Sequence, residues 1–495
     1  MNFILSAIIF IPFLTSFSII FIPANREKEI RFLAGFVTIL ELLLSILIFK
    51  GYDFSAGGFQ FLEEYKWLPS LNIKYLVGVD GLSVVTVLLT TITFASSFFG
   101  SHSIKSSVKG YFILFFILEG ALVGTFSALD MFLFYIFWEV SLFPMYFLIG
   151  MWGGPRREYA AIKFFIYTLV GSVFLLISMF VIYFYLEPHT FDWREIFSKR
   201  DTFPFAFQKF LWLGMYVAFA IKVPSFPFHT WLPDAHVEAP TPMSVILAGI
   251  LLKMGGYGIL RFCIPLFPQA SWYWSMPLAI IGLINIVYGG LVCMSQRDFK
   301  SLVAYSSISH MGYVLLGIST LTKSGFDGAI FQMFAHGLTT ACLFLSVGVI
   351  YDRIHTRDLQ RIGGFAGIMP RFLGISIIGF FAALGLPGLA TFVSEFLVYL
   401  STYKALGSII FIAVLGTLIS AGYVLWTIQR VFWGKPYLEH YKKVPEINSW
   451  EAISILIPNT LLVVFGIFPK VIIDVYARYT NEITDLLRTY VKLLI

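Results

Sequence analysis

Six ionisable side chains occur within strongly apolar stretches of this sequence. They are two carboxylates, two lysines and two histidines: Glu139, Glu395, Lys222, Lys253, His310 and His336. A charge at the centre of a membrane helix costs about 2.5–3.5 kcal/mol, so the four charged residues oppose insertion by roughly 10 kcal/mol or more. Such groups persist where they pair, contact water or have a function. Because all three types exchange protons, the pattern predicts a proton path.

Lys222 lies where an apolar stretch, AFAIKVPSFPFHTWLPDAH, is interrupted by prolines. Pro224 and Pro227 lack a backbone donor and clash with the preceding turn, so we expect the helix to break near Pro224. The carbonyl groups freed at the break give this helix end a partial negative charge, which favours a cation. A broken helix with an ionisable residue at the break is typical of ion-conducting membrane proteins.

Glu139 and Lys253 have neighbours that leave space beside them. Pro144 follows Glu139 closely and frees a backbone carbonyl. Gly249 and Gly256 share a helix face with Lys253, so another helix is expected to approach that lysine closely. A single Glu–Lys pair is equally well explained as a salt bridge that fixes helix register. The number of ionisable groups favours a path over a bridge.

Other polar residues are given structural interpretations. Three acids in or near apolar runs, Glu41, Asp80 and Glu119, are interpreted as structural or interfacial. The segment HTWLPDAHVEAPT contains four side chains that bind metals, but its prolines favour a membrane re-entry turn: His229, Asp234, His236 and Glu238. The three cysteines are far apart and no nucleotide-binding glycine motif occurs, so we expect no metal or cofactor on this chain.

The elements that hold these residues are expected to be membrane helices. The chain has 495 residues, of which 58% are hydrophobic and 13% charged, so its solvent must be a lipid bilayer. The net charge of +6 fits Lys and Arg anchors at the membrane surface and needs no nucleic-acid partner. The sequence predicts an all-α polytopic protein with about fourteen spanning helices, at 2–23, 31–50, 76–100, 110–129, 130–152, 161–186, 205–236, 241–262, 272–295, 300–321, 325–351, 371–403, 407–434 and 449–469. The stretch 371–403 is expected to be interrupted where Gly385, Pro387 and Gly388 occur.

The ends of the chain are expected on the non-cytoplasmic side of the membrane. Loops after odd-numbered helices contain about twice as many Lys and Arg residues as the other loops, which places the odd loops in the cytoplasm. From Lys470 onward, apolar residues recur at helical spacing. This pattern predicts an amphipathic helix that lies on the membrane or on a partner.

Three motifs resemble a known family. FWEVSLFPMYFLIGMWGG, AIKVPSFPFHTWLPDAHVEAPTPMSVILAGILLKMGGYG and SISHMGYVLLG are similar to the antiporter-like membrane subunits of respiratory complex I, the proton-pumping NADH:quinone oxidoreductase. The resemblance covers essentially the whole chain. It implies fourteen helices, with helices 1–3 in 1–109, two inverted five-helix repeats in 110–262 and 263–434, each with one broken helix, and helix 14 plus the amphipathic helix in 435–495.

The resemblance also implies roles for the ionisable residues. Glu139 and Lys222 correspond to a coupled pair, Lys253 to a central relay and Glu395 to the exit-side group. His310 and His336 lie between Lys253 and Glu395. A glutamate at the Glu395 position is typical of the subunit M branch, whereas its sister subunits have lysine there.

The implied partners are the other membrane subunits of complex I, including its sister antiporter-like subunits, together with the lipid bilayer and protons. The redox centres belong to other subunits. The implied location is the bacterial inner membrane, with a thylakoid or organelle inner membrane as the alternative. Two other functions remain open: a subunit of an Mrp-type Na⁺/H⁺ antiporter, which has the same fold, and a structural spacer that pumps nothing.

Overall fold

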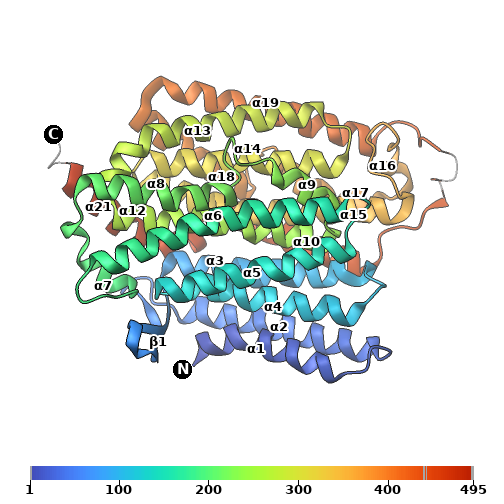
Figure 1. Cartoon of the computed structure of the whole chain (residues 1–495). Helices are drawn as coiled ribbons and strands as arrows, with labels where there is room; N and C mark the ends of the chain where they lie inside the picture. The colour runs from blue at the N-terminus through green and yellow to red at the C-terminus, as the bar shows by residue number, and fades with distance from the viewer. Residues whose placement is uncertain (1–2, 439–440, 442, 492–495) are drawn as a thin grey trace.

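The computed structural model describes residues 3–438, 441 and 443–491, and shows long helices that run side by side (Figure 1). The last part of the predicted 435–495 segment, residues 492–495, therefore lies outside the described residues. The long elements are α1 (Ile4–Phe21), α2 (Glu27–Gly51), α3 (Gly81–Gly100), α4 (Val108–Ser127), α5 (Met131–Trp152), α6 (Arg157–Tyr185), α8 (Phe205–Lys222), α13 (Pro268–Ser295), α14 (Phe299–Ser319), α15 (Lys323–Ile354), α18 (Ala390–Leu406), α19 (Ile410–Phe432), α20 (Ser449–Ile467) and α21 (Lys470–Val491).

Shorter elements connect these helices. The short α-helices are α7 (Trp193–Ser198), α9 (Trp231–Glu238), α10 (Thr241–Ile246), α11 (Leu252–Gly258), α12 (Ile264–Leu266), α16 (Phe365–Ile368) and α17 (Pro370–Ala383). Two π-helical turns, η4 (Leu247–Leu251) and η5 (Ile259–Cys263), join α10, α11 and α12. Short 3₁₀ turns lie at η1 (Pro69–Leu71), η2 (Ser101–Ser103), η3 (Arg200–Thr202) and η6 (Gly407–Ile409).

The chain is a multi-pass membrane protein. Within the described residues, twelve helical segments are long and apolar enough to cross a membrane. Both predicted interruptions are confirmed, because α8 ends at Lys222 before α9, and α17 ends at Ala383 before α18. The prediction of about fourteen spans also counted the two interrupted stretches, and that number stays a prediction.

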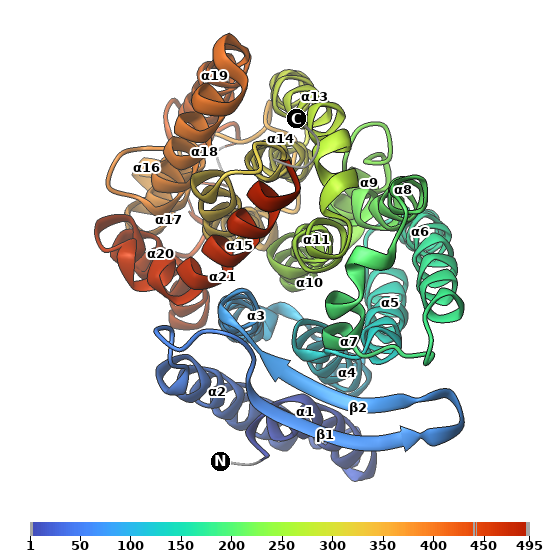
Figure 2. The same cartoon turned by 90° about the vertical axis from the view of Figure 1, so that its left-hand side faces the viewer.

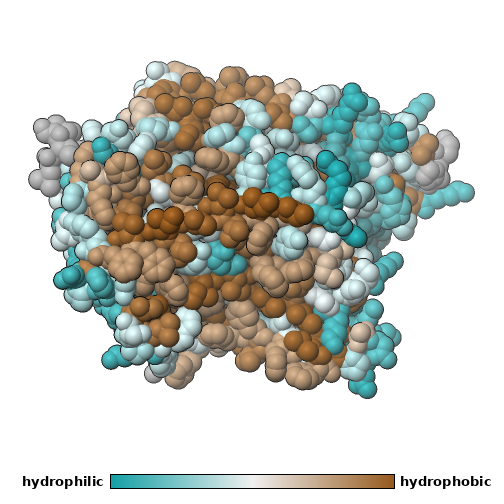
Figure 3. All heavy atoms as spheres, in the orientation of Figure 1, coloured by the Kyte–Doolittle hydropathy of each residue, from teal (hydrophilic) through white to brown (hydrophobic). Residues whose placement is uncertain are grey.

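The surface agrees with a lipid environment. Figure 3 shows a broad hydrophobic area over the middle of one face, with hydrophilic residues concentrated toward the ends of the helices. Large apolar side chains are exposed on outer helices, for example Phe36 of α2, Ile166 of α6 and Leu418 of α19. Such extended apolar surface is stable in lipid or against a partner but not in water.

The all-helical prediction missed one β-hairpin. Strand β1 (Gln60–Leu68) pairs antiparallel with β2 (Ile73–Val79), and Figure 2 shows the hairpin lying across one end of the bundle. The third helix was predicted to begin at 76, but it begins at Gly81. Asp80 is its N-cap, since the carboxylate accepts a hydrogen bond from the Ser83 amide at 3.0 Å.

The C-terminal helix α21 lies on its own bundle, so the prediction that it covers the membrane or a partner was wrong. Tyr476 and Tyr479 donate hydrogen bonds to the carbonyl oxygens of Asp327 and Leu260, at 3.0 and 2.8 Å. The helix is amphipathic as predicted, but its apolar face packs against the end of the bundle (Figure 2). Sequence periodicity identifies an apolar face without identifying what covers it.

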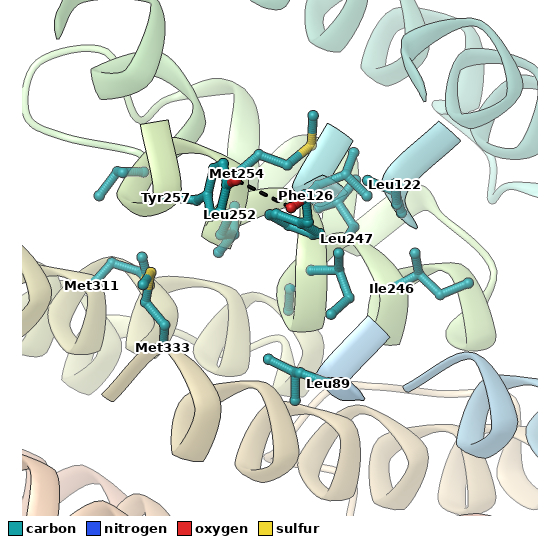
Figure 4. Packing of buried hydrophobic residues seen from close by; sticks show 14 of the residues in the cluster. Leu89, Leu122, Phe126, Ile246, Leu247, Leu252, Met254, Tyr257, Met311 and Met333 are labelled. Carbon is teal, nitrogen blue, oxygen red and sulfur yellow. Dashed lines mark hydrogen bonds between the residues drawn. The ribbon is translucent and has the colours of Figure 1, made fainter. Parts of the chain in front are cut away.

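The segment from α10 to α12 lies at the centre of the bundle. All 18 residues of the most hydrophobic stretch within 241–266 are buried. Figure 4 shows Leu247, Leu252 and Met254 packed among side chains of neighbouring helices, and the Tyr257 hydroxyl donates to the Phe126 carbonyl at 3.1 Å. A helix that is apolar on all sides must be enclosed by protein or lipid. Lys253 lies in this segment and is therefore surrounded by protein.

A buried ion pair joins one end of this central segment to the start of α3. Arg261 of η5 makes two hydrogen bonds with Asp80, at 2.7 and 2.6 Å, and only 1% of its surface is exposed. The rings of Trp193, Tyr257 and Tyr479 lie over the guanidinium at 5.2–5.6 Å. This two-bond geometry compensates both charges and supports the structural interpretation of Asp80.

Candidate functional site

Lys222 is the last residue of α8, as the proline pattern predicted. Its amine is buried, with 1% of the residue exposed, and has no hydrogen-bond partner among the described residues. The amine lies over the aromatic rings of Trp138 and Phe164, at 5.2 and 5.7 Å from their centroids. The aromatic faces and the negative end of α8 both favour a cation here.

Glu139 follows Trp138 on α5, the residue whose ring lies 5.2 Å from the Lys222 amine. No ion pair within 4.0 Å joins the side chains of Glu139 and Lys222. One carboxyl oxygen is buried and has no hydrogen-bond partner. The structure therefore brings an acid near the Lys222 amine without the close two-bond salt bridge that joins Arg261 to Asp80.

Lys253 has polar partners on two sides. Its amine donates to the carbonyl oxygen of Ala248, at 2.5 Å, and lies 2.7 Å from Nδ1 of His336 on α15. Ala248 belongs to the π-helical turn η4, immediately before α11. A π turn places a carbonyl five residues back beside the lysine and is a frequent feature of functional sites.

Two glycines allow α15 to reach this lysine. A Cβ on Gly256 would lie 2.5 Å from the sulfur of Met333, and a Cβ on Gly249 would lie 3.7 Å from the carbonyl oxygen of Gly337. Both neighbours are on α15, on either side of His336. The prediction that another helix approaches Lys253 closely is confirmed, and the structure identifies that helix as α15.

His310 and His336 lie between Lys253 and Glu395. The rings of His310 and His336 are 5.6 Å apart, centroid to centroid. Nδ1 of His310 lies 3.4 Å from a carboxyl oxygen of Glu395, and both residues are buried. Lys253, His336, His310 and Glu395 thus form a continuous series of neighbouring proton-binding side chains inside the bundle.

Glu395 lies beside the second helix break. Gly385 lies between α17 and α18 with φ at +75°, and a Cβ there would come within 2.8 Å of a Glu395 carboxyl oxygen. Glycine is required for both reasons: the left-handed backbone and the adjacent carboxylate. The hydroxyl of Thr391 also donates to the Ala382 carbonyl, which links the two half-helices.

Lys222 and Lys253 are on neighbouring segments without a direct polar contact. A Cβ on Gly255 would lie 2.5 Å from the Phe219 carbonyl oxygen, so α11 packs tightly against the end of α8. No hydrogen bond joins the two amines within the described residues. A proton that passes between them would need a water molecule as carrier.

Sequence reasoning missed two buried basic side chains near Lys253 and His336. His236 of α9 stacks on Phe344 at 4.7 Å, and both of its ring nitrogens lack hydrogen-bond partners in the described part of the chain. Lys300 of α14 is buried and donates to the Ala239 carbonyl oxygen. From the sequence, His236 is predicted only as a possible metal ligand, and Lys300 lies at the start of the predicted helix 300–321 without a predicted role. The apolar run on the C-terminal side of Lys300 was the available signal.

The four metal-binding side chains of the 229–238 segment have different neighbours. Asp234 pairs with Lys163 at 2.7 Å, and Glu238 accepts a hydrogen bond from the Arg156 amide at 3.0 Å. His229 lies 3.3 Å from the Tyr288 hydroxyl. No group of three metal-binding side chains occurs among the residues described. The absence of a cofactor on this chain stays a prediction.

Comparison with known families matches residues 128–420 to the family described as NADH:quinone oxidoreductase/Mrp antiporter, transmembrane. This range contains all six predicted site residues. Subunit M of the NADH-quinone oxidoreductase of Rickettsia conorii is 41% identical over 480 residues, which covers 96% of this chain and 97% of that protein.

Two solved structures have the same fold. A chain of respiratory complex I from Thermus thermophilus superposes with a TM-score of 0.90 at 29% identity, covering 98% of this chain and 99% of that one. A chain of the Mrp complex from Dietzia sp. superposes with a TM-score of 0.88 at 19% identity, covering 98% of each chain. At that identity the second likeness concerns the fold alone.

Proposed function

This chain belongs to the family of NADH:quinone oxidoreductase and Mrp antiporter membrane subunits and is a proton-translocating membrane-arm subunit of NADH:quinone oxidoreductase; we propose that it moves protons along the buried line from Lys222 to Glu395. It has no redox role of its own in this proposal. The driving charge movement comes from partner subunits of the complex. The observation that carries the proposal is the contact of Lys253 with His336 and the short spacing onward to Glu395.

The second half of the line is a relay of groups that both accept and release protons. The Lys253 amine passes a proton to Nδ1 of His336, because these atoms are 2.7 Å apart. An imidazole that gains a proton on one nitrogen can release one from the other, and Nε2 of His336 has no fixed partner in the described residues. His310 receives the proton and passes it to Glu395 across 3.4 Å.

The first half is a charge switch. A nearby carboxylate favours a protonated amine, so an ionised Glu139 would hold the proton on Lys222 and a neutral Glu139 would not. Desolvation already disfavours the charged amine, since Lys222 has no hydrogen-bond partner in the described residues. A charge change that reaches Glu139 from a neighbouring subunit would therefore release the Lys222 proton toward Lys253 through water.

We also propose the finer organisation that the sequence implied. Two inverted five-helix units, at 110–262 and 263–434, are supported by equivalent features: Asp130 caps α5 and Asp298 caps α14, and each forms an isolated β-bridge, with Asp192 and Asp358 respectively. Both termini would face away from the cytoplasm of a bacterial inner membrane. The start of α1 and α21 lie at the same end of the bundle, which supports this orientation (Figure 1). Sister antiporter-like subunits would be its neighbours.

Substitutions of Glu395 test whether the end of the line needs a titratable group. Glu395→Lys should retain partial proton uptake, because an amine beside His310 can still accept and release a proton. Glu395→Ala should lose proton uptake about tenfold or more, a usual effect of removing a proton-transfer group. The measurement is proton uptake by proteoliposomes that contain the assembled complex.

The comparison of these two variants includes its own control, since both remove the carboxylate next to Gly385. Equal and near-normal rates for the lysine and alanine variants would show that Glu395 is not on the path. Uptake that depends on sodium in both the wild type and the lysine variant would instead favour the Mrp-type antiporter function.

A further inference from the structure

Two buried acids in the N-terminal helices have no role in the line described above. Glu41 lies in α2 and Glu119 in α4, and neither has any exposed surface. All four of their carboxyl oxygens lack a hydrogen-bond partner. Among the described residues, they are the only acids with both oxygens buried and unpartnered. Sequence analysis classed them as structural or interfacial, yet a structural carboxylate would have a partner.

The two acids lie at a similar depth on helices that pack against each other, since Glu41 is ten residues before the end of α2 and Glu119 eight residues before the end of α4. These distances are about 15 and 12 Å along the helices, and the β-hairpin that follows α2 reaches the end of α4 through the bridge of Val77 to Ala128. A third unpartnered polar atom is on the same buried face of α2: the hydroxyl of Thr38, one turn before Glu41 and without exposed surface. One turn after Glu41, Ser45 shares a hydrogen bond of 2.6 Å with Thr91 of α3. The opposite face of α2 is apolar and exposed, as expected for lipid contact.

No cation among the described residues faces this pair. Two of the helices packed around it, α1 and α3, contain no charged residue at all. Of the segments that pack against α4 from the other side, α5 carries an acid, Glu139, and α11 carries Lys253, whose amine contacts Ala248 and His336. On α4, Lys109 donates at one helix end to the Ile20 carbonyl oxygen, at 2.8 Å. On α2, Arg31 donates to the Ser101 carbonyl oxygen, at 3.2 Å, and Lys50 is exposed at the other end of the helix. Two ionised carboxylates would therefore be buried without any compensating charge.

The helices are packed closely beside Glu119, which favours a proton over a metal cation as the bound ion. Gly120 follows Glu119, and a Cβ there would lie 2.8 Å from the Ile9 carbonyl oxygen and 2.6 Å from the Phe13 ring of α1. A dehydrated metal cation needs about six oxygen ligands, and a monovalent one would still leave a net negative charge. A proton on each carboxyl leaves no charge and turns each group into both donor and acceptor.

We propose that Glu41 and Glu119 form a second proton-binding site, which holds at least one proton at neutral pH in the membrane interior. The site lies in the N-terminal helices, before Glu139 and the residues of the Lys222–Glu395 line. Glu119 is eight residues before the end of α4, and Glu139 is eight residues after the start of α5. Both acids are therefore about 12 Å from the connecting turn, at the same depth on adjacent antiparallel helices.

Infrared difference spectroscopy of the assembled complex tests this site without depending on pumping. The wild type should show the carbonyl stretch of a protonated carboxyl at neutral pH, shifted in heavy water. Glu41→Gln/Glu119→Gln should lose that signal, and Glu27→Gln, an exposed acid on α2, should keep it. A spectrum unchanged by the double substitution would overturn the proposal, whatever the variants of the Lys222–Glu395 line do.

Melting temperatures of the single variants decide the question if the double variant does not assemble. Glutamine copies a neutral carboxyl and cannot ionise, whereas the wild-type pair must keep its proton against a rising pH. Glu41→Gln and Glu119→Gln should therefore gain thermal stability relative to the wild type as the pH rises from neutral to alkaline. A stability difference between variant and wild type that does not change with pH would overturn the proposal, because a proton held by the folded pair and released on unfolding must make that difference depend on pH. Wild-type stabilisation by sodium but not potassium chloride, absent in these variants, would identify a metal cation and overturn the proton assignment.

Discussion

Replacing Lys253 by methionine is expected to reduce proton uptake and the coupled quinone reductase rate together, by about tenfold or more. The lysine amine is the group that contacts His336, at 2.7 Å, so its loss removes the only polar connection from α11 to the histidines in the described residues. Methionine has a similar length and an apolar stem. Packing against α15 near Gly249 and Gly256 should therefore survive, and the complex should assemble in normal amount.

The control for this variant is Lys404→Met, which removes an exposed lysine from the last turn of α18 and should leave both rates unchanged. If Lys253 were only structural, removing a buried cation that has no acid partner would stabilise the protein and leave function intact. Unchanged proton uptake per electron, at an unchanged reductase rate, would remove Lys253 from the mechanism.

Glu139→Gln is expected to abolish or strongly reduce coupled reductase activity while the complex still assembles. Glu139 is next to Trp138, whose ring lies 5.2 Å from the Lys222 amine, and glutamine keeps the size of the glutamate side chain without its charge. Lys222 then loses the group that favours its protonated form, in a site where desolvation opposes the charge. Reductase activity with a water-soluble quinone, normalised to assembled complex, measures the effect.

Glu158→Gln is the matched control, since Glu158 is an exposed acid at the start of the adjacent helix α6. Its activity should equal that of the wild type. Full proton pumping by an assembled complex that carries Glu139→Gln would contradict the charge-switch role.

Helix breaks and buried charges could be predicted from sequence because their causes are local. Proline next to Lys222 and glycine at 385 interrupt helices wherever the chain is placed. The glycines beside Lys253 predicted a close neighbour for the same reason. The identity of that neighbour could not be predicted, because the contact with His336 joins residues 83 positions apart and depends on how α15 packs against α11.

The errors have a common physical origin. The strand sequence IKYLVGV is apolar and runs directly into the apolar helix α3, so hydrophobicity alone does not separate the two elements. The amphipathic pattern of α21 indicated an apolar face, and only the tertiary structure shows that the bundle itself covers it.

Proton uptake by proteoliposomes that contain the complex with Lys222→Met tests the central claim most directly, because Lys222 is where the charge of Glu139 and the proton line meet. The complex should assemble normally, since the amine makes no hydrogen bond or ion pair with the described residues that its loss would leave unsatisfied. We predict that proton uptake per assembled complex falls about tenfold or more, together with the coupled reductase rate. Normal pumping by the Lys222→Met complex would contradict the account and leave this chain a structural spacer of the membrane arm.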